Sequence, residues 1–148
     1  MPRSRKRSRS WLAQHSLSLV AALLLSLWIT GYIYLEPQSR LSSFCGNAIA
    51  DWSGSLVIIL GTKFFYEIGS SESRKIRGRL SNSTLEFLRE HSLLIFLFIT
   101  AIGWTVLYLK MSADGKWGQV VGNLISEWIQ MAGLVFLTKR LVEIGSKP

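Results

Sequence analysis

The sequence predicts an all-α integral membrane protein, a four-helix bundle made of two tandem, parallel two-helix repeats. Hydrophobic residues make up 49% of the chain and the mean hydropathy is positive, at +0.29, which is typical of a protein in contact with lipid. Two uncharged stretches, Leu17 to Leu35 and Ser92 to Leu109, are long enough to cross about 30 Å of hydrocarbon. The chain also repeats itself at an offset of 76 residues.

The repeat aligns residues 15–70 with residues 91–146 without a gap, and fifteen of the 56 positions are identical. A shared period means that one structural unit is used twice. Because each unit contains an even number of spans, both copies should cross the membrane in the same sense, related by an axis along the membrane normal. The identities include His15/His91, Trp28/Trp104, Tyr32/Tyr108, Gly46-Asn47/Gly122-Asn123, Trp52/Trp128, Thr62-Lys63/Thr138-Lys139 and Glu67/Glu143.

The chain divides into four predicted segments. They are a basic cytoplasmic head (1–10), a first two-span repeat (11–70), a cytoplasmic linker (71–83) and a second two-span repeat (84–148). In the first repeat we expect a span over about 12–35 and a second span that ends near Ile68. In the second repeat, Ser83-Thr84-Leu85-Glu86 fits a capping box, so a helix should begin near Thr84. The last span should end near Ile144.

The distribution of Lys and Arg predicts the orientation of the spans. With a cytoplasmic N-terminus, fourteen basic residues fall on the inner side and three, Arg40, Lys110 and Lys116, on the outer side. This positive-inside bias places both termini in the cytoplasm, which suits a bacterial inner membrane. It accounts for the net charge of +8 without a nucleic-acid partner, and the basic head is suited to anionic lipid headgroups. With no small-x-small cleavage site after it, the first stretch should be a span rather than a signal peptide.

The sequence lacks the usual signatures of an enzyme. Cys45 is the only cysteine, so no disulfide within the chain and no cysteine-based metal site is expected. No phosphate loop, nucleotide fingerprint, or nucleophile with a nearby base is present. We therefore predict no enzymatic activity, no cofactor and no metal. Four tryptophans that recur as pairs are predicted to anchor the bundle at the outer interface, namely Trp28, Trp52, Trp104 and Trp128.

One polar pattern lies inside the predicted spans. Asn47 and Asp51 are four residues apart, as are their counterparts Asn123 and Glu127, which places each pair on one helix face. If the two repeats bring Asp51 and Glu127 together, two carboxylates could not both ionise cheaply, so the pair could carry a proton or hold a cation. The alternative is structural, because acidic residues in the first turns of a helix are favoured by its dipole.

The remaining repeated charges lie near the inner helix ends. Lysine and glutamate four residues apart predict surface ion pairs, Lys63–Glu67 and Lys139–Glu143. His15 and His91 are predicted to be interfacial, because a relay or metal site would need them near carboxylates, and Asp51 and Glu127 belong to the opposite leaflet.

Several of these motifs resemble an uncharacterised family of small bacterial membrane proteins with paired spans. The shared features are His-Ser-Leu at the start of a span, Asn123 with Ser126-Glu127 and Gln130-Met131, and the segment from Gly69 to Arg74. The family pattern is similar to Asn-x-x-Ser-Glu-Phe-x-Gln-Met, followed by Gly-Ser-x-Glu-Ser. Here Trp128 replaces the usual Phe, and Ala50 to Ser55 in the first repeat departs further. The resemblance implies an integral bacterial membrane protein and no particular chemistry.

These observations predict a non-enzymatic, four-span membrane protein that assembles with itself or with a larger membrane complex. Small residues spaced four apart, such as Ala50 and Gly54, would allow close helix contacts. The alternative is a small channel or transporter for protons or cations, with Asp51 and Glu127 as the intramembrane carboxylates and Asn47 and Asn123 as neutral ligands. An enzyme acting on lipid is the third reading.

Overall fold

Four long helices and one short helix make up the protein. The computed structural model describes residues 11–37, 39–70, 78, 80–112, 114–139 and 141, and within these residues the chain is helical without strands. Each of the four long helices is long and apolar enough to cross a membrane, which confirms the prediction of a multi-pass membrane protein. The helices are α1 (Trp11–Tyr34), α2 (Arg40–Phe64), α3 (Ser83–Glu90), α4 (Ser92–Lys110) and α5 (Lys116–Leu137).

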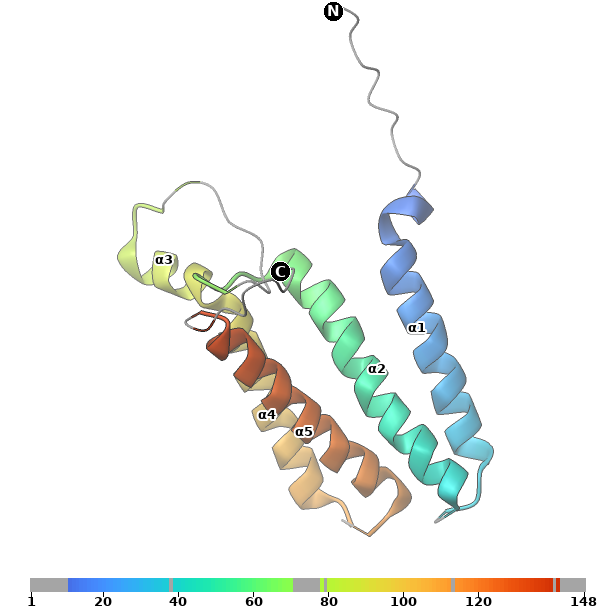
Figure 1. The fold of residues 1–148 in the computed structure, drawn as a ribbon. Coiled ribbons are helices and arrows are strands. Elements are labelled where there is room, and N and C mark those ends of the chain that lie inside the picture. The colour runs from blue at the N-terminus through green and yellow to red at the C-terminus, as the bar shows by residue number, and fades with distance from the viewer. Residues whose placement is uncertain are drawn as a thin grey trace, which may run out of the picture.

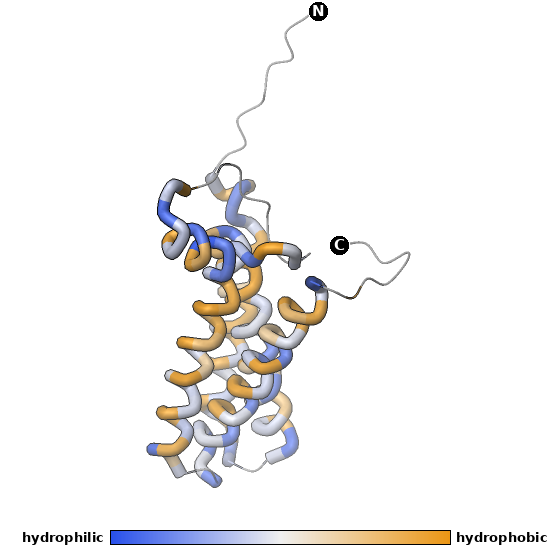
Figure 2. Tube along the Cα trace, turned by 90° about the vertical axis from the view of Figure 1, so that its left-hand side faces the viewer, coloured by the Kyte–Doolittle hydropathy of each residue, from blue (hydrophilic) through white to orange (hydrophobic). Residues whose placement is uncertain are grey.

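The long helices form two hairpins that pack side by side (Figure 1). Helix α1 packs on α2, α2 packs on α5, and α5 packs on α4, so the second helix of each hairpin lies at the centre. The two hairpin loops lie at one end of the bundle, and α3 lies at the other (Figure 1). Figure 2 shows hydrophobic residues along the helix shafts and hydrophilic residues concentrated at both ends. This is the distribution that a bilayer requires.

The two hairpins share local contacts at the 76-residue offset. Helix α2 begins at Arg40 and α5 begins at Lys116, which are 76 residues apart. A Cβ atom added at Gly46 would lie 3.4 Å from the Tyr32 ring, and one added at Gly122 would lie 3.4 Å from the Tyr108 ring. In each hairpin a glycine therefore lets the tyrosine of the preceding span pack against the helix backbone. The duplication itself stays a prediction.

The hairpins are also joined at their loop end. The Tyr32 hydroxyl of α1 donates a hydrogen bond to the Lys116 carbonyl oxygen at the start of α5. The Lys116 ammonium group in turn donates to the Leu35 carbonyl oxygen, at 2.6 Å. Leu35 lies just after the end of α1, where backbone carbonyls lack a partner within the helix. They hold the start of α5 against the end of α1.

The predicted third span differs from the observed structure in two ways. The N-cap is Asn82, whose side-chain oxygen accepts from the amides of Thr84 (2.9 Å) and Leu85 (3.3 Å), so the predicted capping box at Ser83 is wrong. Glu86 accepts instead from the Leu80 amide, at 2.9 Å. In addition, the helix stops at Glu90, and α4 begins as a separate helix.

The break between α3 and α4 has a local cause. The amide of Leu93 donates to the carbonyl oxygen of Tyr66 at 3.0 Å, and the amide of Leu94 donates to the carboxylate of Glu67 at 3.1 Å. In an unbroken helix these amides would bond to carbonyl groups four residues earlier. Because the segment after α2 supplies other acceptors, a new helix begins at Ser92.

Candidate functional site

Asp51 and Glu127 lie near the middle of their helices. Asp51 follows Arg40, the first residue of α2, by eleven residues, and Glu127 follows Lys116, the first residue of α5, by eleven. At about 1.5 Å per residue, each acid is about 16 Å from its helix start. Each acid therefore lies near the middle of its helix rather than in the first turn. The dipole of its own helix does not explain either position, because that effect is confined to the first and last turns.

The structure brings together all four predicted polar residues at the contact between α2 and α5. Asn123 Nδ2 donates a hydrogen bond to Asn47 Oδ1 at 2.5 Å. The Glu127 carboxyl group faces that of Asp51 closely enough for their side chains to interact. Each residue thus meets its own counterpart from the other repeat. Contacts of this kind are expected close to the axis of the predicted repeat.

The surroundings of this acid pair, Asp51 with Glu127, are polar on one side and tightly packed on the other. Asp51 is exposed in the isolated chain, whereas Glu127 is partly buried. A Cβ atom added at Gly54 would lie 3.1 Å from Glu127 Oε2, so the absence of a side chain there makes room for the carboxylate. Within the described part of the chain, no Lys, Arg or His forms an ion pair with either acid. The pair therefore favours a bound proton or a bound cation.

The tryptophans next to the acids lie near the middle of their helices. Trp52 and Trp128 are each the thirteenth residue of their helix, and for Trp52 interfacial anchoring stays a prediction. Trp128 is only 3% exposed, its Nε1 donates to Thr100 Oγ1 at 2.7 Å, and its ring packs edge-on against Trp104. Trp128 is therefore a core residue that joins α5 to α4. For Trp28 and Trp104, which are partly buried, interfacial anchoring stays a prediction.

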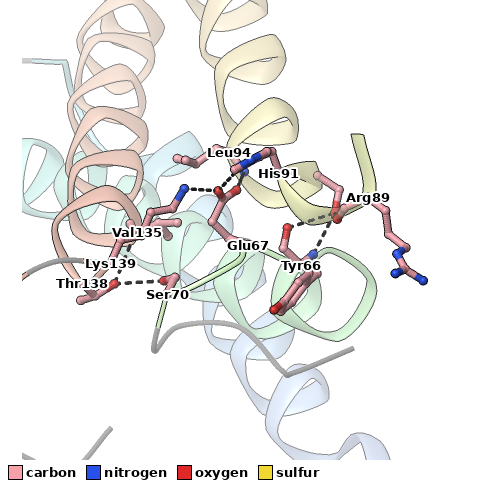
Figure 3. Close-up of polar contacts among 10 residues, drawn as sticks. Tyr66, Glu67, Ser70, Arg89, His91, Leu94, Val135, Thr138 and Lys139 are labelled. Atoms are coloured by element: carbon pink, nitrogen blue, oxygen red, sulfur yellow. Dashed lines mark hydrogen bonds and ion pairs between the residues drawn. The ribbon is translucent and has the colours of Figure 1, made fainter. Parts of the chain in front are cut away.

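A second carboxylate, Glu67, is fully buried. It lies at the end of the bundle opposite the hairpin loops, and Figure 3 shows its contacts. Helix α2 ends at Phe64 rather than near Ile68, so Glu67 lies in the segment beyond the helix. Its Oε1 contacts His91 Nδ1 at 2.6 Å and forms an ion pair with Lys139 Nζ, and its Oε2 accepts from the Leu94 amide. We refer to Glu67, His91 and Lys139 as the inner cluster.

The inner cluster corrects two predictions. The surface pair Lys63–Glu67 is wrong, because Glu67 is 0% exposed and pairs with Lys139 of the other hairpin. His91 contacts a carboxylate, whereas the sequence predicted none near it. Lys139 forms an ion pair with Glu67. The predicted pair Lys139–Glu143 and the predicted helix end at Ile144 stay predictions, because Glu143 and Ile144 lie outside the described residues.

The inner cluster connects three elements, and its contacts stabilise their relative positions. It ties the end of α2 to the first turn of α4 and to Lys139 just after α5. Ser70 Oγ and Thr138 Oγ1, 3.0 Å apart, connect the same two hairpins nearby (Figure 3). A carboxylate at the N-terminus of α4 also interacts favourably with the dipole of that helix. Because both oxygens of Glu67 have partners, burial of this carboxylate costs little free energy.

The repeat contained a signal for this cluster that sequence analysis did not use. Glutamate, lysine and histidine all recur at the inner helix ends, at Glu67/Glu143, Lys63/Lys139 and His15/His91. In the first hairpin Lys63 Nζ lies 3.3 Å from His15 Nδ1, which repeats the Lys–His association of the inner cluster. The predicted ion pairs joined each lysine to the glutamate four residues later in its own repeat, whereas Lys139 pairs with Glu67 of the other repeat.

Neither carboxylate site has the composition of a metal centre. In the residues that the structure describes, no group of three or more His, Cys, Asp or Glu side chains could hold a metal ion. Comparison with family models, curated proteins and solved structures finds no match for this chain. The resemblance to small bacterial membrane proteins therefore stays a prediction, and the functional argument rests on the geometry of the two sites.

Proposed function

We propose that this is a non-enzymatic, multi-pass membrane protein that binds and transports a proton or a monovalent cation at the pair formed by Asp51 and Glu127. One observation supports this above all: two carboxyl groups face each other near the middle of two central spans, and no basic side chain of the described residues pairs with them. Ionisable groups at this depth are costly and are typical of ion and proton pathways.

The chemistry of the pair favours a single positive charge. Two unit charges about 4 Å apart repel by about 1 kcal/mol in water and by more in a less polar medium. One proton or one monovalent cation between the carboxyl groups reduces this repulsion. The amides of Asn47 and Asn123 lie one helical turn toward the loop end, where their oxygen atoms are neutral ligands for an entering cation.

A liposome flux assay tests this function. The purified chain is reconstituted into liposomes that contain a dye sensitive to protons, sodium or potassium, and flux is started with a gradient of the matching ion. Asp51→Asn and Glu127→Gln should each reduce the initial rate at least tenfold. Glu36→Gln, at an exposed carboxylate in the first hairpin loop, is the matched control and should keep the rate of the unmodified chain. Absence of flux for the unmodified chain under all three gradients would refute the proposal.

Purely structural assembly in a membrane complex is the second candidate function. The specific observation in its favour is that Asn47, Asp51 and Ser55 are exposed in the isolated chain although they lie within a span. Polar residues at such depth require protein or water beside them. Assembly without flux would leave the liposome rate of the unmodified chain equal to that of empty liposomes.

We further propose that the protein lies in a bacterial inner membrane with both termini in the cytoplasm. The support is the excess of basic residues at the end of the bundle that carries Lys63, Arg89 and Lys139, where the basic head would meet anionic lipid headgroups. Labelling with a membrane-impermeant thiol reagent tests the orientation. On a Cys45→Ala background, Ser112→Cys in intact cells should react and Ser81→Cys should not.

A further inference from the structure

One side of the central helix pair is polar and uncovered. The exposed residues on this side are Asn47, Asp51 and Ser55 of α2, with Ser126 and Gln130 of α5. We refer to these five residues as the polar face. They are continuous with the contact between Asn47 and Asn123, so they form one strip along the α2–α5 junction. All five lie within helices long enough to span a membrane.

The outer helices show what a lipid-facing surface looks like in this protein. Large apolar side chains are exposed in the middle of α1 and α4, including Leu23, Leu27, Ile99 and Ile102. Hydrocarbon can cover such side chains without loss of hydrogen bonds. It cannot do so for the polar face, because amide, hydroxyl and carboxyl groups without partners cost free energy in an apolar medium. The polar face therefore needs a polar cover.

We propose that a second copy of this chain covers the polar face, in a symmetric dimer that encloses two acid pairs in one shared site. Dimerisation rests on the polar face, whereas transport through the shared site rests on the proposed function.

The asparagine pair argues for a second copy rather than an unrelated partner. Asn123 Nδ2 donates to Asn47 Oδ1, and among the described residues neither Asn47 Nδ2 nor Asn123 Oδ1 has a hydrogen-bond partner. If the oxygen and nitrogen positions of both side-chain amides were exchanged, one N–H donor and one oxygen acceptor would still lack a partner. A surface with one donor and one acceptor at the same depth matches a copy of itself turned by 180°. Four amides then close a ring at the interface.

The charge distribution fixes the relative direction of the two copies. Fourteen basic residues on one side of the spans and three on the other direct every copy into the membrane in the same sense. The dimer axis must then lie along the membrane normal, so residues at equal depth meet. Asn47 of each copy faces Asn123 of the other, and the acid pairs adjoin one turn deeper. An antiparallel dimer would bring the asparagines of one leaflet against the opposite leaflet.

Disulfide cross-linking between two differently tagged chains tests the dimer. Both chains carry Cys45→Ala, one carries Asn47→Cys, the other carries Asn123→Cys, and the two are co-expressed and oxidised in native membranes. The expected product is a covalent dimer that carries both tags. The matched control places Leu23→Cys in one chain and Ile99→Cys in the other, because these residues are also 76 apart but lie on the apolar outer surfaces. The control should give at least tenfold less product.

A second measurement does not depend on substitution in the interface. Single-molecule photobleaching of the unmodified chain, carrying one fluorophore at its C-terminus in liposomes, should show two bleaching steps. Single steps at all protein densities, or equal cross-linking by the asparagine pair and the control pair, would overturn the dimer. Asp51→Asn separates the two proposals, because it should reduce flux at least tenfold and preserve the cross-link. A cross-linked dimer without flux refutes only transport, and flux from single-step particles refutes only the dimer.

Discussion

The two carboxylate sites of this protein differ in their burial and in whether the carboxylates have cationic partners. Glu67 is completely buried, yet each of its oxygens has partners, which include a lysine, a histidine and a helix amide. Asp51 and Glu127 are more accessible, but they face each other and have no cationic partner among the described residues. The buried glutamate lies at the end of the bundle opposite the hairpin loops, whereas the acid pair lies near the middle of the helices.

The difference separates a structural carboxylate from a candidate functional one. A buried charge that is fully paired contributes to a defined arrangement of helices, and the loss of one partner is costly. A like-charged pair stores repulsion that a proton or cation relieves, so its energy depends on what is bound. Burial alone would have selected Glu67 as the functional residue. The identity of the partners selects Asp51 and Glu127.

The largest effect is expected when the inner cluster loses its lysine. Lys139→Met keeps most of the packing but leaves Glu67 buried without its ammonium partner, so the free energy of unfolding should fall by about 3 kcal/mol. Unfolding by SDS in mixed micelles measures this change. Lys63→Met is the matched control, since Lys63 is the repeat counterpart and is exposed, and it should change stability by only a few tenths of a kcal/mol. Equal losses for the two variants would contradict the comparison.

The acid pair should respond in the opposite direction. Asp51→Asn removes the repulsion with Glu127, so the free energy of unfolding should rise by on the order of 1 kcal/mol at pH 9. The gain should be smaller at pH 5, because repulsion requires both carboxyl groups to be ionised. The same micelle titration at the two pH values measures the difference. A loss of stability at pH 9, or an equal gain at both values, would show that the two acids do not repel.

The hydrogen bond between the central tryptophan and α4 should have a moderate effect. Thr100→Val removes the acceptor of the Trp128 indole N–H, so stability should decrease by about 1 kcal/mol. Trp128→Phe and the double variant complete a cycle that isolates the bond. Thr105→Val is the control, because the Thr105 hydroxyl bonds only to the Ala101 carbonyl of its own helix. A coupling energy near zero would leave Trp128 as a packing residue.

The smallest effect is expected outside both carboxylate sites. Asn82→Ala removes the side-chain cap of α3, and about 0.5 kcal/mol of local stability should be lost because the cap is exposed. Amide hydrogen exchange should accelerate in α3 and remain unchanged in α2 and α5. Faster exchange across the whole bundle would mean that α3 is coupled to the inner cluster more tightly than its contacts indicate.

Hydropathy and charge predicted the four spans, because lipid imposes the same length and composition on each of them. The repeat identified all four polar residues at the α2–α5 contact. It could not locate Asp51 and Glu127 along their helices, since that depends on where each helix begins. Arg40 and Lys116 are the first helical residues, although a hydropathy pattern would exclude both from a span. Helices can extend beyond their apolar stretch, which moved the acids from the ends to the middle.

The inner cluster was missed for a different reason. A spacing of four residues predicts a contact only within a continuous helix, and α2 ends three residues before Glu67. The segment beyond α2 then bonds to the first amides of α4 through Tyr66 and Glu67. Both contacts join residues 27 positions apart, and no periodicity within one element reports them. In the sequence, only the recurrence of the same charged residues in both repeats indicated that charged residues of the two hairpins contact each other.

Helix α3 has a consequence for how deeply the bundle is immersed. It turns away from the line of α4 at the end of the bundle that carries the inner cluster (Figure 1). Leu85, Phe87 and Leu88 are exposed on it, beside the basic Arg89. Short helices of this composition rest at the level of lipid headgroups. If α3 rests at that level, it would set the depth of the four spans in the bilayer and, through the lengths of α4 and α5, the depth of the acid pair.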